Sequence, residues 1–150
     1  MSIKNINAYI HFNGTAEKAI ELYKSALGAK TEVMMRYSDI PGDTPPPGHK
    51  NLVMHSELRI GEGTLMVSDA VPERPVASEG NTQVALDFAD PAAMAKAFEA
   101  LAAGGTVTLP IHDAFWGAKF GMLTDAYGAR WLLNCQVNQP GNGGGKNGAK

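Results

Sequence analysis

The sequence has little cysteine, no marked excess of either charge and no long apolar run, and each absence excludes a class of protein. The single cysteine, Cys135, cannot form an intrachain disulfide, which is typical of proteins in a reducing compartment. No stretch approaches the roughly 20 apolar residues that span a bilayer, and the N-terminal residues lack the apolar core of an export signal. We therefore expect a cytoplasmic protein with no membrane partner.

Charge and motif content exclude further classes. The 13 lysines and arginines are scattered and are outnumbered by 15 acidic residues, so we expect no nucleic-acid partner. No glycine-rich loop follows a strand in the spacing that binds a nucleotide, a dinucleotide or a methyl-donor nucleotide. No G-x-S-x-G motif is present. Chemistry that depends on a bound nucleotide or on a serine nucleophile is therefore not supported.

The most informative stretch is 52–70, which reads LVMHSELRIGEGTLMVSDA. It predicts two strands joined by a turn at 61–63, where glycine tolerates a positive φ. His55, Glu57 and Arg59 fall on one face of the first strand, because side chains alternate along a strand. Such a polar row on a buried sheet is costly unless it is hydrated, paired or used. We therefore expect this face to line a cavity.

Hydrophobic periodicity and turn residues predict an alternation of strands and helices along the rest of the chain. The expected strands are 3–12, 31–37, 52–60, 64–68, 82–88, 106–111, 119–124 and 129–136, and the expected helices are 16–27 and 91–103. Thr15 and Asp90 are the expected N-caps, and Gly28 is an expected C-cap. Residues 112–117 are expected to form a loop or strand edge, and residues 139–150 a disordered tail.

This order is a βαβββ unit used twice, which indicates an internal duplication. We expect modules at about 4–70 and 81–137 within a single domain spanning 1–138. The two halves also share a short sequence motif: MVSDA in the first half matches MLTDA in the second. We therefore expect Asp69 and Asp125 to be structural turn or cap residues at equivalent positions of the two modules.

Four segments carry a resemblance to a known family: NAYIHFNG at 7–14, AEKAIELYKSALG at 16–28, LMVSDA at 65–70, and FWG through TDAYG to tryptophan at 115–131. They resemble the vicinal oxygen chelate superfamily of glyoxalase I, bleomycin- and fosfomycin-resistance proteins and extradiol dioxygenases, and within it the PhnB-like branch. The resemblance implies an α+β fold in which two βαβββ modules form a cup-shaped mixed sheet. It also implies a homodimer that shares or completes the cavities.

In metal-dependent members of that superfamily, four cup-facing residues from the first and last strands of each module hold one divalent ion. Matching residue by residue places these positions at Ala8, Glu57, Gln83 and Leu132. A slip of one residue offers Asn7 or Tyr9 in place of the first. A working site needs at least three protein ligands, so we expect neither the usual metal site nor another cofactor. The alternative is a divalent metal at His55 and Glu57, joined by His11 if the first strand bulges.

Two hypotheses of function follow. The first is a metal-independent protein that binds a small, planar or partly apolar molecule. The second is a lyase, isomerase or dioxygenase that uses His55 and Glu57 for proton transfer or metal binding, because histidine titrates near neutral pH. Arg59 or Arg36 would then stabilise a developing oxyanion. The expected ligand-binding residues are His55, Glu57, Arg59, Arg36, Gln83, Phe115 and Trp116.

Four of these residues also have a structural interpretation. Glu57 can pair with Arg59, Arg36 or another basic residue across the sheet. His55 can be a hydrogen-bonded histidine of the sheet with no further role. Phe115 and Trp116 can stack on a planar ligand or can pack in the core or in a dimer interface.

Overall fold

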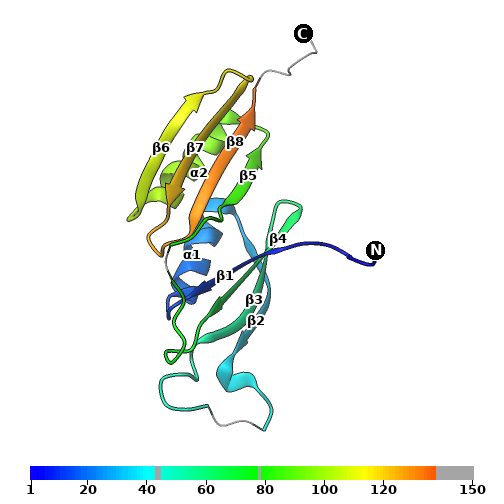
Figure 1. Cartoon of the computed structure of the whole chain (residues 1–150), viewed down its shortest axis with the longest axis vertical. Helices are drawn as coiled ribbons and strands as arrows, with labels where there is room; N and C mark the ends of the chain where they lie inside the picture. The colour runs from blue at the N-terminus through cyan, green and yellow to red at the C-terminus, as the bar shows by residue number, and fades with distance from the viewer. Residues whose placement is uncertain (43–44, 78, 138–150) are drawn as a thin grey trace. The chain divides into compact units, whose positions relative to one another are not determined.

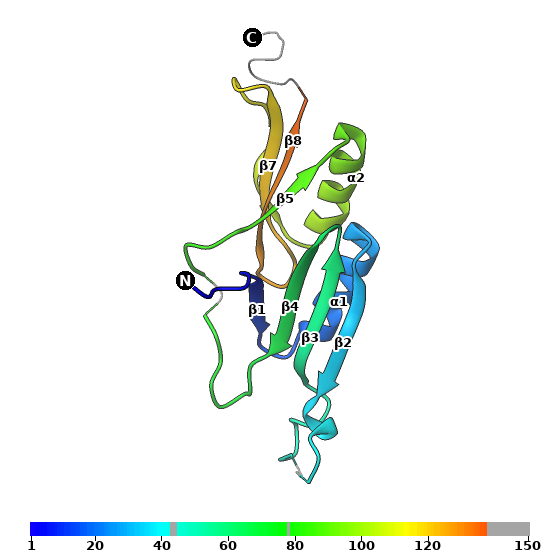
Figure 2. The ribbon, with the colours of Figure 1, turned by 90° about the vertical axis from the view of Figure 1, so that its right-hand side faces the viewer.

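A computed structural model describes residues 1–42, 45–77 and 79–137 of the chain (Figures 1 and 2). The chain divides into two compact units, Met1–Ser78 and Glu79–Lys150, and each contains one βαβββ module. The expected α+β fold of two such modules is therefore confirmed. The expected tail at 139–150 lies outside the described residues, and the expected single domain stays a prediction.

The two modules share one topology. The first contains β1 (Ala8–Phe12), α1 (Ala16–Leu27), β2 (Lys30–Arg36), the short 3-10 helix η1 (Tyr37–Asp39), β3 (Val53–Ile60) and β4 (Gly63–Asp69). The second contains β5 (Val84–Phe88), α2 (Pro91–Ala102), β6 (Thr106–Asp113), β7 (Ala118–Thr124) and β8 (Arg130–Gln136). The strand orders are β1-β4-β3-β2 and β5-β8-β7-β6. In each sheet the first and last strands of the module pair in parallel, and the other pairs are antiparallel.

Three predicted strand boundaries were wrong by two residues or more, among them the start of β5, which lies at Val84 rather than at residue 82. The first strand begins at Ala8 rather than at residue 3, because its pairing with β4 starts only there. The strand β6 continues to Asp113, through residues expected to form a loop or edge. His112 and Asp113 pair with Phe120 and Lys119 of β7, so the hairpin turn begins only after Asp113.

In each module one helix covers one face of the sheet (Figures 1 and 2). The helix α1 buries Ala16, Ala19, Ile20 and Tyr23 and packs on β3 and β4. The helix α2 buries Met94, Ala97, Phe98 and Leu101 and packs on its own four strands. Full burial of each large apolar side chain contributes about 1.5–3 kcal/mol. The opposite face of each sheet, which no helix of its module covers, is called here the helix-free face.

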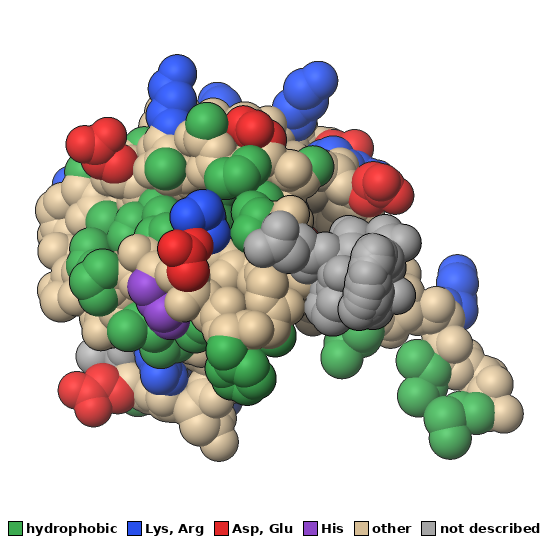
Figure 3. Space-filling model, turned by 90° about the horizontal axis from the view of Figure 1, so that it is seen from above, with side chains coloured by type: hydrophobic (Ala, Val, Ile, Leu, Met, Phe, Trp, Pro, Cys, Tyr) green, Lys and Arg blue, Asp and Glu red, His purple; other side chains and the backbone are tan. Residues whose placement is uncertain are grey.

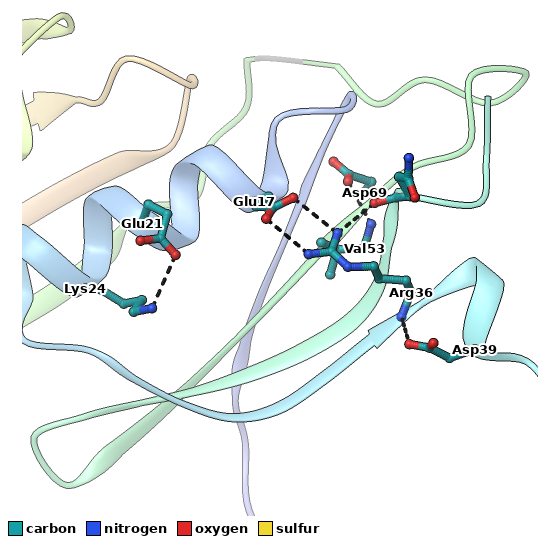
Figure 4. Close-up of polar contacts among 8 residues, drawn as sticks. Glu17, Glu21, Lys24, Arg36, Asp39, Val53 and Asp69 are labelled. Atoms are coloured by element: carbon teal, nitrogen blue, oxygen red, sulfur yellow. Dashed lines mark hydrogen bonds and ion pairs between the residues drawn. The ribbon is translucent and has the colours of Figure 1, made fainter.

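The start of α1 is capped by a residue far away in the sequence. The predicted cap by Thr15 was wrong, because its side chain makes no capping hydrogen bond. The buried carboxylate of Asp69 takes that role: its Oδ1 accepts from the backbone N–H groups of Gly14 at 3.0 Å and Ala16 at 2.9 Å. Its Oδ2 accepts from the N–H of Val53 at 3.0 Å (Figure 4). One side chain therefore ties together the helix start, β3 and β4.

The other predicted caps were correct. Gly28 ends α1 in the left-handed conformation with a φ of 67°, which glycine adopts without a Cβ clash. Asp90 caps α2 locally, because its Oδ2 accepts from the N–H of Ala93 at 2.8 Å, and Pro91 occupies the first helical position.

Asp125 is also structural, as expected. Its Oδ1 accepts from the N–H groups of Tyr127 at 2.9 Å and Ala129 at 3.0 Å, and its Oδ2 accepts from the indole of Trp131 at 2.9 Å. The expectation that Asp69 and Asp125 occupy equivalent positions was wrong. Asp69 ends the last strand of its module, whereas Asp125 follows β7, the third strand of the other. What the two copies of the motif share is a carboxylate at the end of an apolar strand that accepts hydrogen bonds from backbone N–H groups.

On the face seen in Figure 3, lysine and arginine side chains are interspersed with aspartate and glutamate side chains, and neither sign forms a stripe. Within the described residues, no helix combines the length and the apolar character needed to cross a membrane.

Candidate functional site

The helix-free face of the first sheet gathers polar side chains from three strands. The register pairs Tyr9 of β1 with Met66 of β4, and Met66 with Glu57 of β3. Directly paired residues share a face, so these side chains lie on the same side of the sheet. By the same register the face includes Tyr9, His11, Val33, Met35, His55, Glu57, Arg59, Thr64, Met66 and Ser68.

Three of these side chains form a hydrogen-bonded chain. The hydroxyl of Tyr9 lies 2.7 Å from Nδ1 of His55, and Nε2 of His55 lies 3.0 Å from Oε2 of Glu57. An ionised carboxylate can only accept, so Nε2 carries a hydrogen. In the neutral imidazole, Nδ1 then accepts from the hydroxyl of Tyr9. The Tyr9–His55–Glu57 chain therefore runs from a hydroxyl donor, through the imidazole, to a carboxylate acceptor.

A second pair holds the tyrosine ring in place. The rings of Tyr9 and His11 are stacked, with centroids 4.4 Å apart and planes 28° from parallel. Nδ1 of His11 lies 2.7 Å from Oγ of the buried Ser68. The condition that β1 must bulge to bring His11 here was wrong, because the register of β1 on β4 runs unbroken from Ala8 to Phe12.

The chain is accessible to a small molecule. The side chains of His55 and Glu57 are 24% and 38% exposed, and Tyr9 is 40% exposed. Met35 lies opposite His55, and Met66 lies between Tyr9 and Glu57 in the register. Apolar groups thus border the polar chain, as in sites where a few polar groups orient a partly apolar ligand.

The structure does not bring Arg36 to this chain. Its guanidinium pairs with Glu17 of α1 at 3.1 Å and donates to the carbonyl oxygen of Asn51 at 2.8 Å (Figure 4). Its backbone N–H donates to Asp39 at 2.8 Å. These contacts give Arg36 a structural role at the end of β2.

Arg59 lies on the helix-free face but is engaged elsewhere. Its Nε lies 3.5 Å from Oε2 of Glu32, and its guanidinium also donates to the carbonyl oxygen of Glu62. The sequence-based expectation that Glu57 pairs with Arg59 or Arg36 was therefore wrong. The basic group within reach of Glu57 is His55.

The remaining predicted site residues belong to the second unit. Gln83 lies just before β5 and donates from Nε2 to Sδ of Met122 at 3.3 Å. Trp116 stacks on Phe120 with centroids 5.3 Å apart, and the edge of Phe115 meets Trp116 at 5.2 Å. Trp116 is 44% and Phe115 is 98% exposed. Trp116 thus packs on its own sheet, whereas Phe115 projects into solvent.

Near these aromatic residues, one carboxyl group titrates unusually. The ammonium of Lys119 lies 2.7 Å from Oδ1 of Asp113, and this hydrogen bond and charge lower the pKa of the Asp113 carboxyl below its ordinary value. The pair joins β6 to β7 at the surface of the second unit.

The sequence model of the Glyoxalase/Bleomycin resistance protein/Dioxygenase superfamily matches residues 5–133. The chain belongs to this superfamily. Protein PA1353 from Pseudomonas aeruginosa is similar in structure, with a TM-score of 0.81 and 34% identity over 91% of this chain and all of that one. Protein YjdN of Escherichia coli is 28% identical over 144 residues, which cover 90% of this chain and 97% of YjdN.

A structure described as a putative 3-demethylubiquinone-9 3-methyltransferase, PhnB protein, from Bacillus cereus has a TM-score of 0.71 and 23% identity. The match covers 88% of this chain and 99% of that one. At this identity the likeness concerns the fold alone. Together these findings confirm the resemblance predicted from the sequence.

The residues present do not fit the metal site of the metal-dependent members. Ala8 pairs with the buried Leu65 and lies on the helix side of β1. Glu57 lies on β3, the third strand of its module, and not on the last strand that the resemblance implies. On its helix-free face the last strand, β4, carries Thr64, Met66 and Ser68. Across the described residues, no group of three or more His, Cys, Asp or Glu side chains is arranged to hold a metal ion.

Sequence reasoning underestimated two residues of the site. Tyr9 was considered only as a metal ligand after a one-residue slip of register, and His11 only on condition that the first strand bulges. The available signal was spacing: Tyr9 and His11 are two residues apart, as are His55 and Glu57, so each pair must share a face of its strand.

Proposed function

We propose that the helix-free face of the first sheet binds a small, planar or partly apolar molecule without the superfamily's four-ligand metal site. The observation that carries this proposal is the Tyr9–His55–Glu57 chain, which is internally paired, partly exposed and bordered by methionine side chains. Membership of a superfamily that includes resistance proteins supports a binding function.

The proposal includes three parts taken from sequence and resemblance. On the second unit, taken by itself, Phe115, Trp116 and Gln83 are proposed as ligand-binding residues, with the exposed ring of Phe115 as a stacking surface. The protein is proposed to act as a homodimer, as the resemblance implies. It is proposed to reside in the cytoplasm, as the single buried cysteine suggests.

The test is a ligand-detected NMR screen of small heteroaromatic compounds against metal-free protein in the presence of EDTA. We expect binders whose affinity falls at least about tenfold, or about 1.4 kcal/mol, in the double variant His55→Ala/Glu57→Ala. Glu62→Ala is the matched control, because Glu62 is exposed in the turn between β3 and β4. Equal affinity in the double variant and the wild type would contradict the proposal.

The second candidate is a metal-dependent or acid–base enzyme of the lyase, isomerase or dioxygenase kind. The observation that favours it is the same His55–Glu57 contact of 3.0 Å, which either holds a proton or offers two neighbouring ligands. Metal content of untagged protein, together with thermal shifts on adding Ni²⁺, Zn²⁺, Mn²⁺ or Fe²⁺, separates the metal-dependent form of this candidate from the binding protein. A near-stoichiometric metal that is lost in Glu57→Ala would favour the metal-dependent enzyme.

A further inference from the structure

We propose that the Tyr9–His55–Glu57 chain is a metal-free proton relay. In this relay the hydroxyl of Tyr9 removes a proton from a bound molecule whose C–H bond is acidified by a neighbouring C=O or C=N group. This inference rests on the proposed binding function and adds an activity to the same site.

The order of the three groups is that of an activated hydroxyl, a base and an orienting carboxylate. The contacts of 2.7 Å and 3.0 Å both fall within the reach that proton transfer requires. The carboxylate of Glu57 fixes the tautomer of His55 and stabilises its cation, which is the task of the acidic member of a catalytic triad. Here a phenol occupies the place of the nucleophile.

The geometry assigns the contact with substrate to Tyr9 rather than to His55. Both ring nitrogens of His55 are engaged, Nδ1 with Tyr9 and Nε2 with Glu57, so neither has a lone pair directed at a ligand. Tyr9 is 40% exposed and is fixed by its stack on His11. The phenol oxygen keeps a lone pair when its hydrogen points toward His55.

The step is balanced within these groups. The C–H bond of the substrate breaks, and its proton forms a new O–H bond on Tyr9. The O–H bond that Tyr9 held breaks, and that proton forms the Nδ1–H bond of His55. The electron pair stays with the substrate, where the C=O or C=N group delocalises it or a bond to a leaving group breaks. The positive charge on His55 is stabilised by Glu57, and no oxidant, reductant or cofactor is required.

The experiment uses 5-nitro-1,2-benzisoxazole, a planar probe that a single base opens. Removal of its C3 proton breaks the ring N–O bond and releases 2-cyano-4-nitrophenolate, which is followed by its visible absorbance. With EDTA present, we expect Tyr9→Phe and His55→Gln each to lower kcat about a hundredfold, the lower part of the range for general acid–base catalysis. Glu57 is a positioning residue, so Glu57→Gln should lower kcat about tenfold and leave KM unchanged.

The matched controls are Tyr127→Phe and Glu62→Gln, which remove the same chemical groups outside this face and should leave kcat unchanged. Binding is measured separately with the 3-methyl derivative of the probe, which has no C3 proton to lose. If this derivative binds but Tyr9→Phe turns over the probe as fast as the wild type, the relay is overturned and the proposed binding function stands. If the derivative does not bind at all, both are overturned.

Circular dichroism of each variant shows whether it is folded. Tyr9→Phe removes only a hydroxyl from a partly exposed ring, so it keeps the test decisive even if His55→Gln disturbs the sheet.

Discussion

The two modules have the same topology but carry different chemistry on their helix-free faces. In the first sheet this face holds the ionisable Tyr9–His55–Glu57 chain. In the second, the corresponding face holds Phe120 and Met122 of β7 with Leu132 and Asn134 of β8 opposite them. Its ionisable residues His112 and Asp87 contact Phe120 and Asn134 respectively. The buried helix-facing residues of both sheets are mostly apolar. The comparison teaches that the residues packed against the helix determine the fold of each module. The residues on the helix-free face can therefore differ between the modules and can form a site in one of them.

The largest expected effects break what the modules share. Asp69→Ala and Asp125→Ala each leave three N–H donors without their carboxylate, and each unsatisfied buried donor costs about 1–3 kcal/mol. We expect each variant to lose about 3 kcal/mol or more of unfolding free energy, measured by urea denaturation. A loss confined to one of them would show that the two carboxylates differ in importance despite their similar contacts.

A smaller effect on stability sharpens the difference between the helix-free faces. The double variant His55→Ala/Glu57→Ala should lower the unfolding free energy by less than about 1 kcal/mol, because partly exposed ion pairs contribute little. The matched double variant in the second sheet, Asn134→Ala/Asp87→Ala, breaks a hydrogen bond of 3.2 Å and should be equally mild. A large loss of thermal stability in the first variant alone would mean that His55 and Glu57 are structural.

The smallest effect concerns Asp113 and Lys119 of the second sheet. Because the folded-state pKa of Asp113 is lowered, the pair stabilises the fold above the ordinary carboxyl value of 3.8, and the contribution is lost as pH falls through the folded pKa. We expect Lys119→Met to raise the Asp113 pKa toward that ordinary value, as followed by NMR titration of its side-chain carbons. Since the group is exposed, the acid transition of the whole protein should not move measurably.

Element order and the repeated βαβββ unit could be predicted from the sequence because they depend on local periodicity and on a repeated pattern. Gly28 and Asp90 were recognisable because their caps are local. The role of Asp69 at the start of α1 could not be predicted, since its partners lie more than fifty residues earlier in the chain. Thr15 occupied the expected position and was chosen in its place.

The candidate site was predictable only in part, for the same reason. His55 and Glu57 lie two residues apart on one strand, so their proximity follows from strand geometry alone. Tyr9 joins them because β1 pairs in parallel with β4, on the far side of β4 from β3. That strand order forms only in the completed sheet and cannot be read from local sequence. The five-residue motif that the two modules share was misleading here, because it suggested that Asp69 and Asp125 occupy equivalent positions.

The two helix caps also imply different orders of assembly during synthesis. The cap of α2 is complete once Ala93 has left the ribosome, because Asp90 precedes it by three residues. The start of α1 must wait until Asp69 has emerged and β4 has docked beside β1. The delay between synthesis of a helix and completion of its N-terminal cap is therefore longer for α1 than for α2. A nascent chain that stops short of Asp69 leaves α1 without its cap.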